Sequence, residues 1–588
     1  ICRILDRMGD GLKTYAGLSE HRGFINSLSS LITEMKKYDI TPDRLESAAS
    51  VIEEGLPLRD KLRELKDIYA EYEKMMAERY RDSDDDLTLA ARKLGQAKSY
   101  DGAEIWIDGF SGFTPQEYNI IGCLLKKAER VSITLCTDSL DGKEDSEGTD
   151  VFYPVKRVYK KAVRIAEECG VPVEPPVVLK EEPPYRFKGS AELSHLERNL
   201  EAYPYKTFRE KTKDISLFSS VNAFSEVEAA ASDIIRLCRD KGLRYRDIAV
   251  LVSNLEAYEG LIEAVFEEYG IPCFIDRKID IIKHPLVRML LSMLDIFNDN
   301  WSYEAVFGYL KTGLTGIETS RIDRLENYVL ACGIRGNSWT NGQDWDMNPG
   351  PISDEGEAED PGDLLKEINE TRYEVVRPLL EFRRKTKGRK KAAEICAALY
   401  DLLCDTGFPE RIENIVDMFR ENGQLSLANE YSQVWNIIME VFDQAVEVMG
   451  DETFGIERFS KILNIGFGEY KLGLIPPSLD QVLVGSADRS RSHEIKAMYI
   501  LGANDGMFPA PMVSEGILTD YDRQSLNKLG VELAADTRSK AFEERFMVYR
   551  ALTTAGGYLR VSWPIADNEG RSMRPSIIVS RLRKLFPA

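Results

Sequence analysis

The stretch EIWIDGFSGFTPQEYNIIGCLLKKAERVSITL, residues Glu104–Leu135, decides the fold class of this chain. Its outer parts, Ile105–Asp108 and Val131–Leu135, are short runs rich in β-forming residues, and the segment between them has the length of one helix. A strand, a helix and a second strand in this order predict a parallel α/β unit. Ligands of such sheets lie beyond the carboxyl ends of the strands, so we expect a functional position directly after Ile107.

The predicted helix has a clear start. We expect Thr114 to be its N-cap and Pro115 its first residue, with Glu117 completing a capping box. Phe110 and Phe113 lie in the loop before it. Their rings predict either a platform that stacks on bases of a single DNA strand or a pair that closes the core.

Outside this stretch, helical and α/β segments alternate. Residues 11–95 and Trp301–Gly473 repeat apolar side chains at the three- and four-residue spacing of amphipathic helices. Short β-rich runs follow each of these blocks. We expect further strands near Ile215–Ser219, Asp247–Val252, Cys273–Ile275, Val482–Ser486, Met498–Gly502 and Tyr558–Trp563. A large helical insertion therefore splits the second α/β domain.

This order predicts an α/β protein with two parallel-sheet domains, each carrying a mainly helical insertion. The predicted segments are 1–100 (helical insertion of the first lobe), 101–212 (remainder of the first domain), 213–300 (first part of the second domain), 301–474 (helical insertion) and 475–588 (second part of the second domain).

The net charge of −21 over 588 residues argues against a protein that coats DNA uniformly, because phosphate binding needs local Lys and Arg. One segment, residues 383–391, contains seven basic residues in nine. This basic run predicts either a phosphate contact or a solvated helix junction. Its members are Arg383, Arg384, Lys385, Lys387, Arg389, Lys390 and Lys391.

Nine cysteines and four histidines are scattered without metal-ligand spacing, so we predict no metal site and no Ser-His-Asp triad. No apolar run reaches the roughly 18 to 20 residues that cross a bilayer, and no signal-peptide layout opens the chain. We therefore expect a cytoplasmic protein. Ile1 is not Met and lies in a helix-like run, so we expect an internal piece of a longer protein.

Three segments carry recognisable motifs: Ile105–Phe110 (IWIDGF), Val482–Leu501 (VLVGSADRSRSHEIKAMYIL) and Glu543–Ala555 (EERFMVYRALTTA). They resemble motifs of the UvrD/RecB branch of superfamily 1 helicases. The resemblance implies two RecA-like domains, each with a helical insertion.

By this resemblance, residues that the family uses for ATP hydrolysis are replaced at three positions. Asp108 remains as a remnant of the Mg²⁺-holding position, but Gly109 stands where the family has the glutamate that activates water. Thr554 stands where the family has the arginine that stabilises the phosphoryl-transfer transition state. Asp488 replaces a histidine of the second motif. Loss of a general base alone slows a reaction by roughly 10² to 10⁴, so we predict crippled hydrolysis.

Other motif positions survive. Glu494 is retained and Arg491 replaces a lysine, which makes both remnants of the nucleotide site. Arg489 is a candidate DNA-phosphate ligand or an idle surface charge. In the third motif we expect Phe546 and Tyr549 to lie in the core. No run of the chain matches the phosphate-binding loop G-x-x-x-x-G-K-[ST].

Longer stretches sharpen the resemblance: Trp106–Glu117 (WIDGFSGFTPQE), Phe274–Leu286 (FIDRKIDIIKHPL) and Ile475–Pro509, which contains LGANDGMFP. Over essentially the whole chain they resemble the AddB subunits of bacterial AddAB helicase–nucleases. The resemblance implies an AddA-type partner, single- and double-stranded DNA, and ATP with Mg²⁺ for the complex. It also implies a nuclease domain with an iron–sulfur cluster and Mg²⁺, and we expect no cofactor and no nuclease activity in this chain.

The sequence thus predicts a DNA-guiding, partner-binding helicase scaffold, impaired in ATP hydrolysis, within a double-strand-break-processing helicase/exonuclease. Two alternatives stay open. One is an active ATP-dependent DNA helicase that uses unconventional residues. The other is a structural module that binds the partner without contacting DNA.

Overall fold

The computed structural model describes residues 1–9, 12–15, 18, 21–79, 82–140, 150–179, 181–347, 361–473, 478–486, 495–511 and 516–587. The chain divides into two compact units, Ile1–Asp276 with Leu479–Ala588, and Arg277–Ser478. Among the described residues, no helix is long and apolar enough to span a membrane. The five segment boundaries expected from the sequence stay a prediction.

The first unit begins with helices. A buried lysine on α2, Lys36, fastens them, because its ammonium group lies 2.7 to 2.9 Å from the carboxylates of Glu73, Asp82 and Asp85. A buried ammonium needs such partners, since burial without them is costly. The helices are α1 (Cys2–Met8), α2 (Arg22–Lys37), α3 (Pro42–Val51), α4 (Pro57–Arg79) and α5 (Asp86–Gln96).

The strand–helix–strand unit expected from Glu104–Leu135 is present. Strands β1 (Glu104–Ile107) and β2 (Arg130–Ile133) pair in parallel, and α6 (Pro115–Leu125) connects them. The predicted capping box is confirmed: the Thr114 amide donates to Glu117 Oε2 over 2.6 Å, and the Glu117 amide donates to Thr114 Oγ1 over 3.3 Å. Helices α7 (Tyr153–Glu168) and α8 (Ala191–Asn199) follow.

A six-stranded parallel sheet forms the centre of the first unit. Its strand order is β3-β12-β11-β4-β10-β5, and each neighbouring pair runs parallel. All six runs that the sequence analysis expects as strands of the second α/β domain belong to it. The strands are β3 (Ile215–Ser220), β4 (Ile248–Val252), β5 (Cys273–Ile275), β10 (Val482–Gly485), β11 (Ala497–Leu501) and β12 (Tyr558–Pro564).

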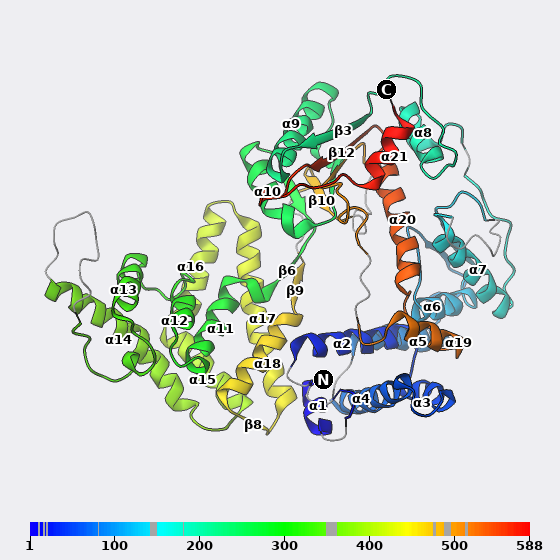
Figure 1. Ribbon diagram of the computed structural model, residues 1–588. Helices are drawn as coiled ribbons and strands as arrows, with labels where there is room; N and C mark the ends of the chain where they lie inside the picture. The colour runs from blue at the N-terminus through cyan, green and yellow to red at the C-terminus, as the bar shows by residue number, and fades with distance from the viewer. Residues whose placement is uncertain are drawn as a thin grey trace. The chain divides into compact units, whose positions relative to one another are not determined.

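Helices cover both faces of this sheet, as Figure 1 shows. On β11, Met498 and Ile500 pack in one core with α20 and α21, whereas Tyr499 packs in the opposite core with α9 and α10. Strands buried on both faces are typical of parallel sheets. The helices on the sheet are α9 (Ala223–Lys241), α10 (Leu255–Glu268), α20 (Thr537–Thr553) and α21 (Ile577–Leu585). Helix α19 (Asp520–Lys528) instead pairs with the N-terminal helices, through Arg523 with Glu34 and Asp522 with Lys61.

The second unit is mainly helical, as its apolar spacing predicts, and it is inserted between β5 and β10. It also contains two short antiparallel strand pairs, β6 (Lys278–Asp280) with β9 (Lys471–Gly473) and β7 (Lys390–Lys391) with β8 (Thr453–Phe454). Its helices, green to yellow in Figure 1, are α11 (Pro285–Asn298), α12 (Tyr303–Leu310), α13 (Thr319–Cys332), α14 (Pro361–Lys385), α15 (Ala392–Asp405), α16 (Phe408–Glu421), α17 (Leu425–Met449) and α18 (Ile456–Glu469).

Candidate functional site

The first motif ends at the carboxyl edge of β1. There the exposed Asp108 carboxylate accepts a hydrogen bond from the hydroxyl of Thr134, which follows β2. Gly109 has a φ of +79°, and a Cβ placed on it would meet nothing within 4 Å. Space for a side chain therefore exists, but the left-handed backbone disfavours every residue except glycine. The position expected to hold a catalytic glutamate offers neither a carboxylate nor a backbone suited to one.

The two phenylalanines of this loop contact each other. Their ring centroids lie 5.1 Å apart in a stacked arrangement, and the Phe113 ring also meets the edge of Tyr118 at 5.4 Å. Phe113 is half-buried, whereas Phe110 is 39% exposed. Phe113 thus serves packing, and Phe110 is the ring of the pair with more free surface.

The third motif forms most of α20. Phe546 and Tyr549 are buried in the core between α20 and the sheet, as expected, and the Tyr549 hydroxyl donates to Glu197 over 2.9 Å. Thr554 caps the C-terminal end of α20, and its hydroxyl donates to the Arg550 carbonyl over 2.6 Å. The position expected to hold the finger arginine therefore carries a short side chain that is already hydrogen-bonded within its own helix.

An arginine that the sequence gives no reason to expect lies beside this position. Arg186 lies in the short 3₁₀ helix Tyr185–Phe187, and its guanidinium donates to the Thr553 carbonyl over 3.2 Å. Burial raises the pKa of the nearby Cys136 thiol, although Arg186 and Arg550 act in the opposite direction. Cationic side chains thus lie near the end of α20. The Pro-rich sequence around Arg186 gives no signal for this placement, because the contact joins residues far apart in the chain.

The candidate residues of the second motif lie outside the described residues. Asp488, Arg489, Arg491 and Glu494 are not among them, and Ser486, directly after β10, is the last residue described before that gap. Their assignments as nucleotide-site remnants and as a DNA contact stay predictions.

The basic run joins α14 to β7 and α15, and most of its charges are matched by acidic neighbours. Lys385 lies 2.8 Å from Asp401, and Lys391 lies 2.7 Å from Asp451. Further ion pairs and contacts are Arg384 with Glu381, Lys390 with Glu394, Arg389 with the Thr453 carbonyl, and Arg383 over the Phe297 ring. This compensation favours the solvated junction over a continuous phosphate-binding surface. Lys387 is exposed and has no partner within the described part of the chain.

A buried carboxylate, also not anticipated, organises the carboxyl edge of the six-stranded sheet. Glu226 on α9 is 1% exposed and accepts hydrogen bonds from the Gly502 amide, the Ser562 hydroxyl and the Tyr258 hydroxyl. Burial raises its pKa, and these three donors oppose the shift. Glu226 thus ties α9 and α10 to β11 and β12 at the edge where ligands of parallel sheets bind.

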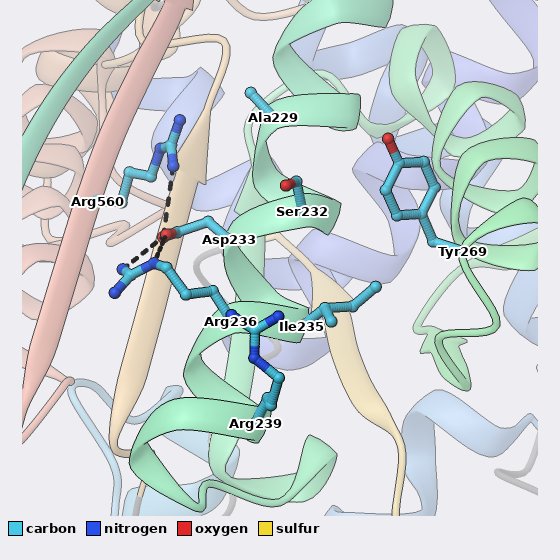
Figure 2. Close-up of a pocket in the computed structure, with 8 residues that line it drawn as sticks. All are labelled: Ala229, Ser232, Asp233, Ile235, Arg236, Arg239, Tyr269 and Arg560. Carbon is cyan, nitrogen blue, oxygen red and sulfur yellow. Dashed lines mark hydrogen bonds and ion pairs between the residues drawn. The ribbon is translucent and has the colours of Figure 1, made fainter.

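A cavity of about 440 Å³ lies along α9, shown in Figure 2. At its wall the Asp233 carboxylate lies between Arg236 and Arg560, at 2.7 and 3.3 Å. Burial alone would raise the pKa of Asp233, but hydrogen bonds from Arg236, Tyr499 and Tyr558 outweigh it and lower the pKa. None of the motif residues lines this cavity. Its ionic groups fasten α9 to the sheet, which is a structural role.

The arrangement of the sheet defines a class of protein. Six parallel strands covered on both faces, a helical unit inserted between β5 and β10, and the third motif on α20 are the features of a UvrD-type helicase fold. The family model described as "UvrD-like helicase C-terminal domain" matches residues 192–564, and the model described as "ADDB, N-terminal" matches residues 1–197.

Curated relatives agree with these models, and each is named as the B-type subunit of an ATP-dependent helicase/deoxyribonuclease. The chain is 64% identical over 584 residues to the relative from Acetivibrio thermocellus, and this match covers 99% of the chain and 51% of the relative. Identity is 52% to the relative from Ruminiclostridium cellulolyticum, with 100% of the chain and 51% of the relative covered. Identity is 46% to the relative from Clostridium botulinum (strain Loch Maree), with 99% of the chain and 51% of the relative covered. The chain belongs to the AddB family of UvrD-like helicase proteins. It spans about half the length of the curated relatives it matches.

Proposed function

We propose that the chain is the helicase-like, DNA-guiding part of a cytoplasmic helicase/deoxyribonuclease that processes DNA double-strand breaks together with an AddA-type subunit. The names of the relatives support this role, because they describe one subunit of an ATP-dependent helicase/deoxyribonuclease. In this proposal the chain supports a DNA strand and the partner while ATP is hydrolysed elsewhere in the complex.

One observation supports the proposal that ATP is hydrolysed elsewhere in the complex. By the resemblance, Gly109 stands at the position that would activate water, and it has no side chain. Thr554 stands at the position that would stabilise the transition state, and its hydroxyl is hydrogen-bonded within its own helix. Phosphoryl transfer depends on positioned charge, and the arginine finger alone contributes roughly 10³- to 10⁵-fold. The Asp108 carboxylate cannot supply both functions.

The cofactors that the resemblance implies have no complete site among the described residues of this chain. Asp108 offers one carboxylate for Mg²⁺, but the adjacent position lacks the base that would use it. For an iron–sulfur cluster, the described cysteines, histidines and carboxylates form no group of three or more that could hold a metal ion. We therefore assign ATP hydrolysis with Mg²⁺ to the partner's motor. The iron–sulfur cluster and nuclease chemistry we assign to parts of the longer protein outside these residues.

Binding of single-stranded DNA separates this role from a purely structural module. The full-length protein with its partner should bind a labelled oligothymidylate with a log–log salt slope of about −0.7 for each phosphate that it neutralises. Binding should be measured from about 50 to 200 mM salt, first with both subunits and then with the partner alone. A slope that is equal for the complex and for the partner alone would favour the structural module.

A further inference from the structure

A second cavity lies in the helical unit, far in the sequence from the three motifs. Its volume is about 370 Å³, at the lower end of the range of ligand sites and large enough for one nucleotide-sized group. The lining includes Trp339 and Gly342 on one side and Arg372, Tyr373, Arg377 and Arg384 of α14 on the other. Three of these six residues are arginines.

The innermost arginine is buried and forms no direct ion pair within the described part of the chain. Arg372 is 0% exposed, and its guanidinium donates to the Trp339 carbonyl at 2.8 and 2.9 Å, to the Gln343 carbonyl at 2.6 Å and to Asn341 Oδ1 at 2.9 Å. All of these acceptors are neutral, and no carboxylate of the described residues forms an ion pair with Arg372. Burial lowers the pKa of Arg372, and electrostatic interaction with Tyr373 and Asp344 opposes the shift. A buried cation whose hydrogen-bond acceptors are all neutral is costly, and an anion in the adjoining cavity would offset that cost.

One hydrogen-bond donor without an acceptor belongs to a residue that lines the same cavity. Trp339 is 0% exposed, and its indole Nε1 has no acceptor in the described part of the chain. Buried polar groups are nearly always hydrogen-bonded, and each exception needs an explanation. An anionic or carbonyl oxygen would supply the acceptor.

The rim adds exposed positive charge. Arg377 is exposed and takes part in none of the ion pairs among the described residues, and Arg384 lies seven residues further on, two turns along the same face of α14. One acidic residue lines the cavity, Glu381, and it is paired with Arg384. Two aromatic rings near the cavity already contact the Arg372 guanidinium, which lies 4.6 Å from the Trp345 ring centroid and 5.2 Å from the Tyr373 ring centroid.

We propose that this cavity binds a phosphate group of a single DNA strand, held by Arg377 at the rim, by the Trp339 Nε1 donor and by the buried charge of Arg372. Guanidinium groups match the geometry and charge of phosphate oxygens, and a cavity of this size takes one nucleotide and excludes a duplex. The inference rests on the DNA-guiding function proposed above. A free nucleoside monophosphate offers the same chemistry, and the test separates the two sources.

The test uses the full-length protein with its partner and the variant Arg377→Gln, which removes one exposed charge and leaves the buried network of Arg372 intact. Arg420→Gln on α16 is the control, because Arg420 is also exposed and its ion pair among the described residues is with Asp417, three residues away. The probes are a labelled oligothymidylate and thymidine 5′-monophosphate. Amide hydrogen exchange of α14, with and without each probe, gives a readout local to the cavity.

We expect the oligothymidylate to protect α14 in the wild type and in Arg420→Gln. In Arg377→Gln the protection should be lost, and binding at this site should weaken roughly tenfold, as expected for one charge-assisted hydrogen bond. Protection of α14 by the monophosphate at low concentration identifies a nucleotide site, and protection by the oligothymidylate alone identifies a strand site. Oligothymidylate binding that leaves α14 unprotected, or equal protection in Arg377→Gln, overturns the cavity proposal and leaves the DNA-guiding function standing. No binding of the oligothymidylate by the wild type overturns both.

Discussion

The hydroxyl of Thr554 donates a hydrogen bond of 2.6 Å to the carbonyl of Arg550, one turn earlier in α20. A threonine at the end of a helix commonly satisfies a carbonyl in this way. The bond turns the only polar atom of the Thr554 side chain back to its own helix. At the corresponding motif position, a hydrolysing helicase of this class has an arginine whose guanidinium reaches the γ-phosphate. Gly109 in the first motif likewise offers no side chain. The two positions at which the resemblance places a catalytic glutamate and a finger arginine therefore carry neither group.

The first prediction concerns the backbone at Gly109. Gly109→Ala should lower the free energy of unfolding by about 1 kcal/mol, because φ is +79° and only the backbone conformation opposes a Cβ there. Gly112→Ala, in the same loop with an ordinary φ and equally open space, should change stability by less than about 0.5 kcal/mol. Urea unfolding of the two variants measures the difference. Equal effects would show that the left-handed conformation at Gly109 does not matter.

The second prediction concerns the buried carboxylate of Glu226. Glu226→Ala should cost about 3 to 5 kcal/mol, because the Gly502 amide and the Ser562 and Tyr258 hydroxyls lose their acceptor in a buried place. Glu226→Gln keeps the shape and one oxygen, and burial already raises the pKa of Glu226 toward the neutral form, so the cost should be smaller, about 1 to 2 kcal/mol. Thermal unfolding tests the order. Exposed Glu228 on the same helix is the control, and its replacement by Ala should be nearly neutral.

The third prediction concerns pH. His284 caps α11, is 4% exposed, and lies against the Tyr431 ring with its Nε2 3.6 Å from Glu430. Burial lowers the pKa of His284 from 6.5 to about 4. The unfolded chain therefore binds more protons between these values, so the stabilisation is complete above pH 6.5 and is lost as pH falls toward 4.

The loss at His284 should reach up to about 3 kcal/mol near pH 4. The free energy of unfolding of the helical unit, measured with urea at several pH values from 7 to 4, should fall as the pH falls. This dependence on pH should be weaker in His284→Gln. If wild type and variant lose stability in parallel, His284 is not the group responsible.

The fourth prediction concerns the basic run. Since Lys385 and Lys391 are paired with Asp401 and Asp451, the double replacement Lys385→Gln/Lys391→Gln should leave the salt slope of DNA binding unchanged. Lys387, which has no partner among the described residues, is the comparison. Its replacement by Gln should reduce the log–log salt slope by at most about 0.7, the value for one phosphate contact. A fall of more than about one unit in the double variant would mean that the run contacts phosphates despite its ion pairs.

Local features of the fold could be predicted from the sequence. The capping box of Thr114 and Glu117 depends on residues three positions apart, and the strands at Cys273–Ile275 and Tyr558–Pro564 are marked by β-forming residues between turns. The structure confirms these elements within a residue or two, because neighbours in the chain decide them.

Features that depend on distant residues were not predictable. Glu226 and Arg372 are charged, and charged residues are seldom fully buried unless paired, so sequence favours the surface for both. Their partners, such as Ser562 for Glu226 and the Trp339 carbonyl for Arg372, come from other elements. For the same reason the sequence alone leaves the basic run open between a phosphate contact and a solvated junction, since Asp401 and Asp451 reach it only after folding.

The central claim, that this chain does not hydrolyse ATP, is tested most directly by DNA-stimulated ATP turnover of the full-length protein in complex with a partner whose own motor is disabled. The complex with an intact partner is the positive control. We predict no turnover above background and no further loss in Asp108→Asn. Turnover that DNA stimulates and that Asp108→Asn abolishes would contradict the account, because it would place an active hydrolytic site at the carboxyl edge of β1.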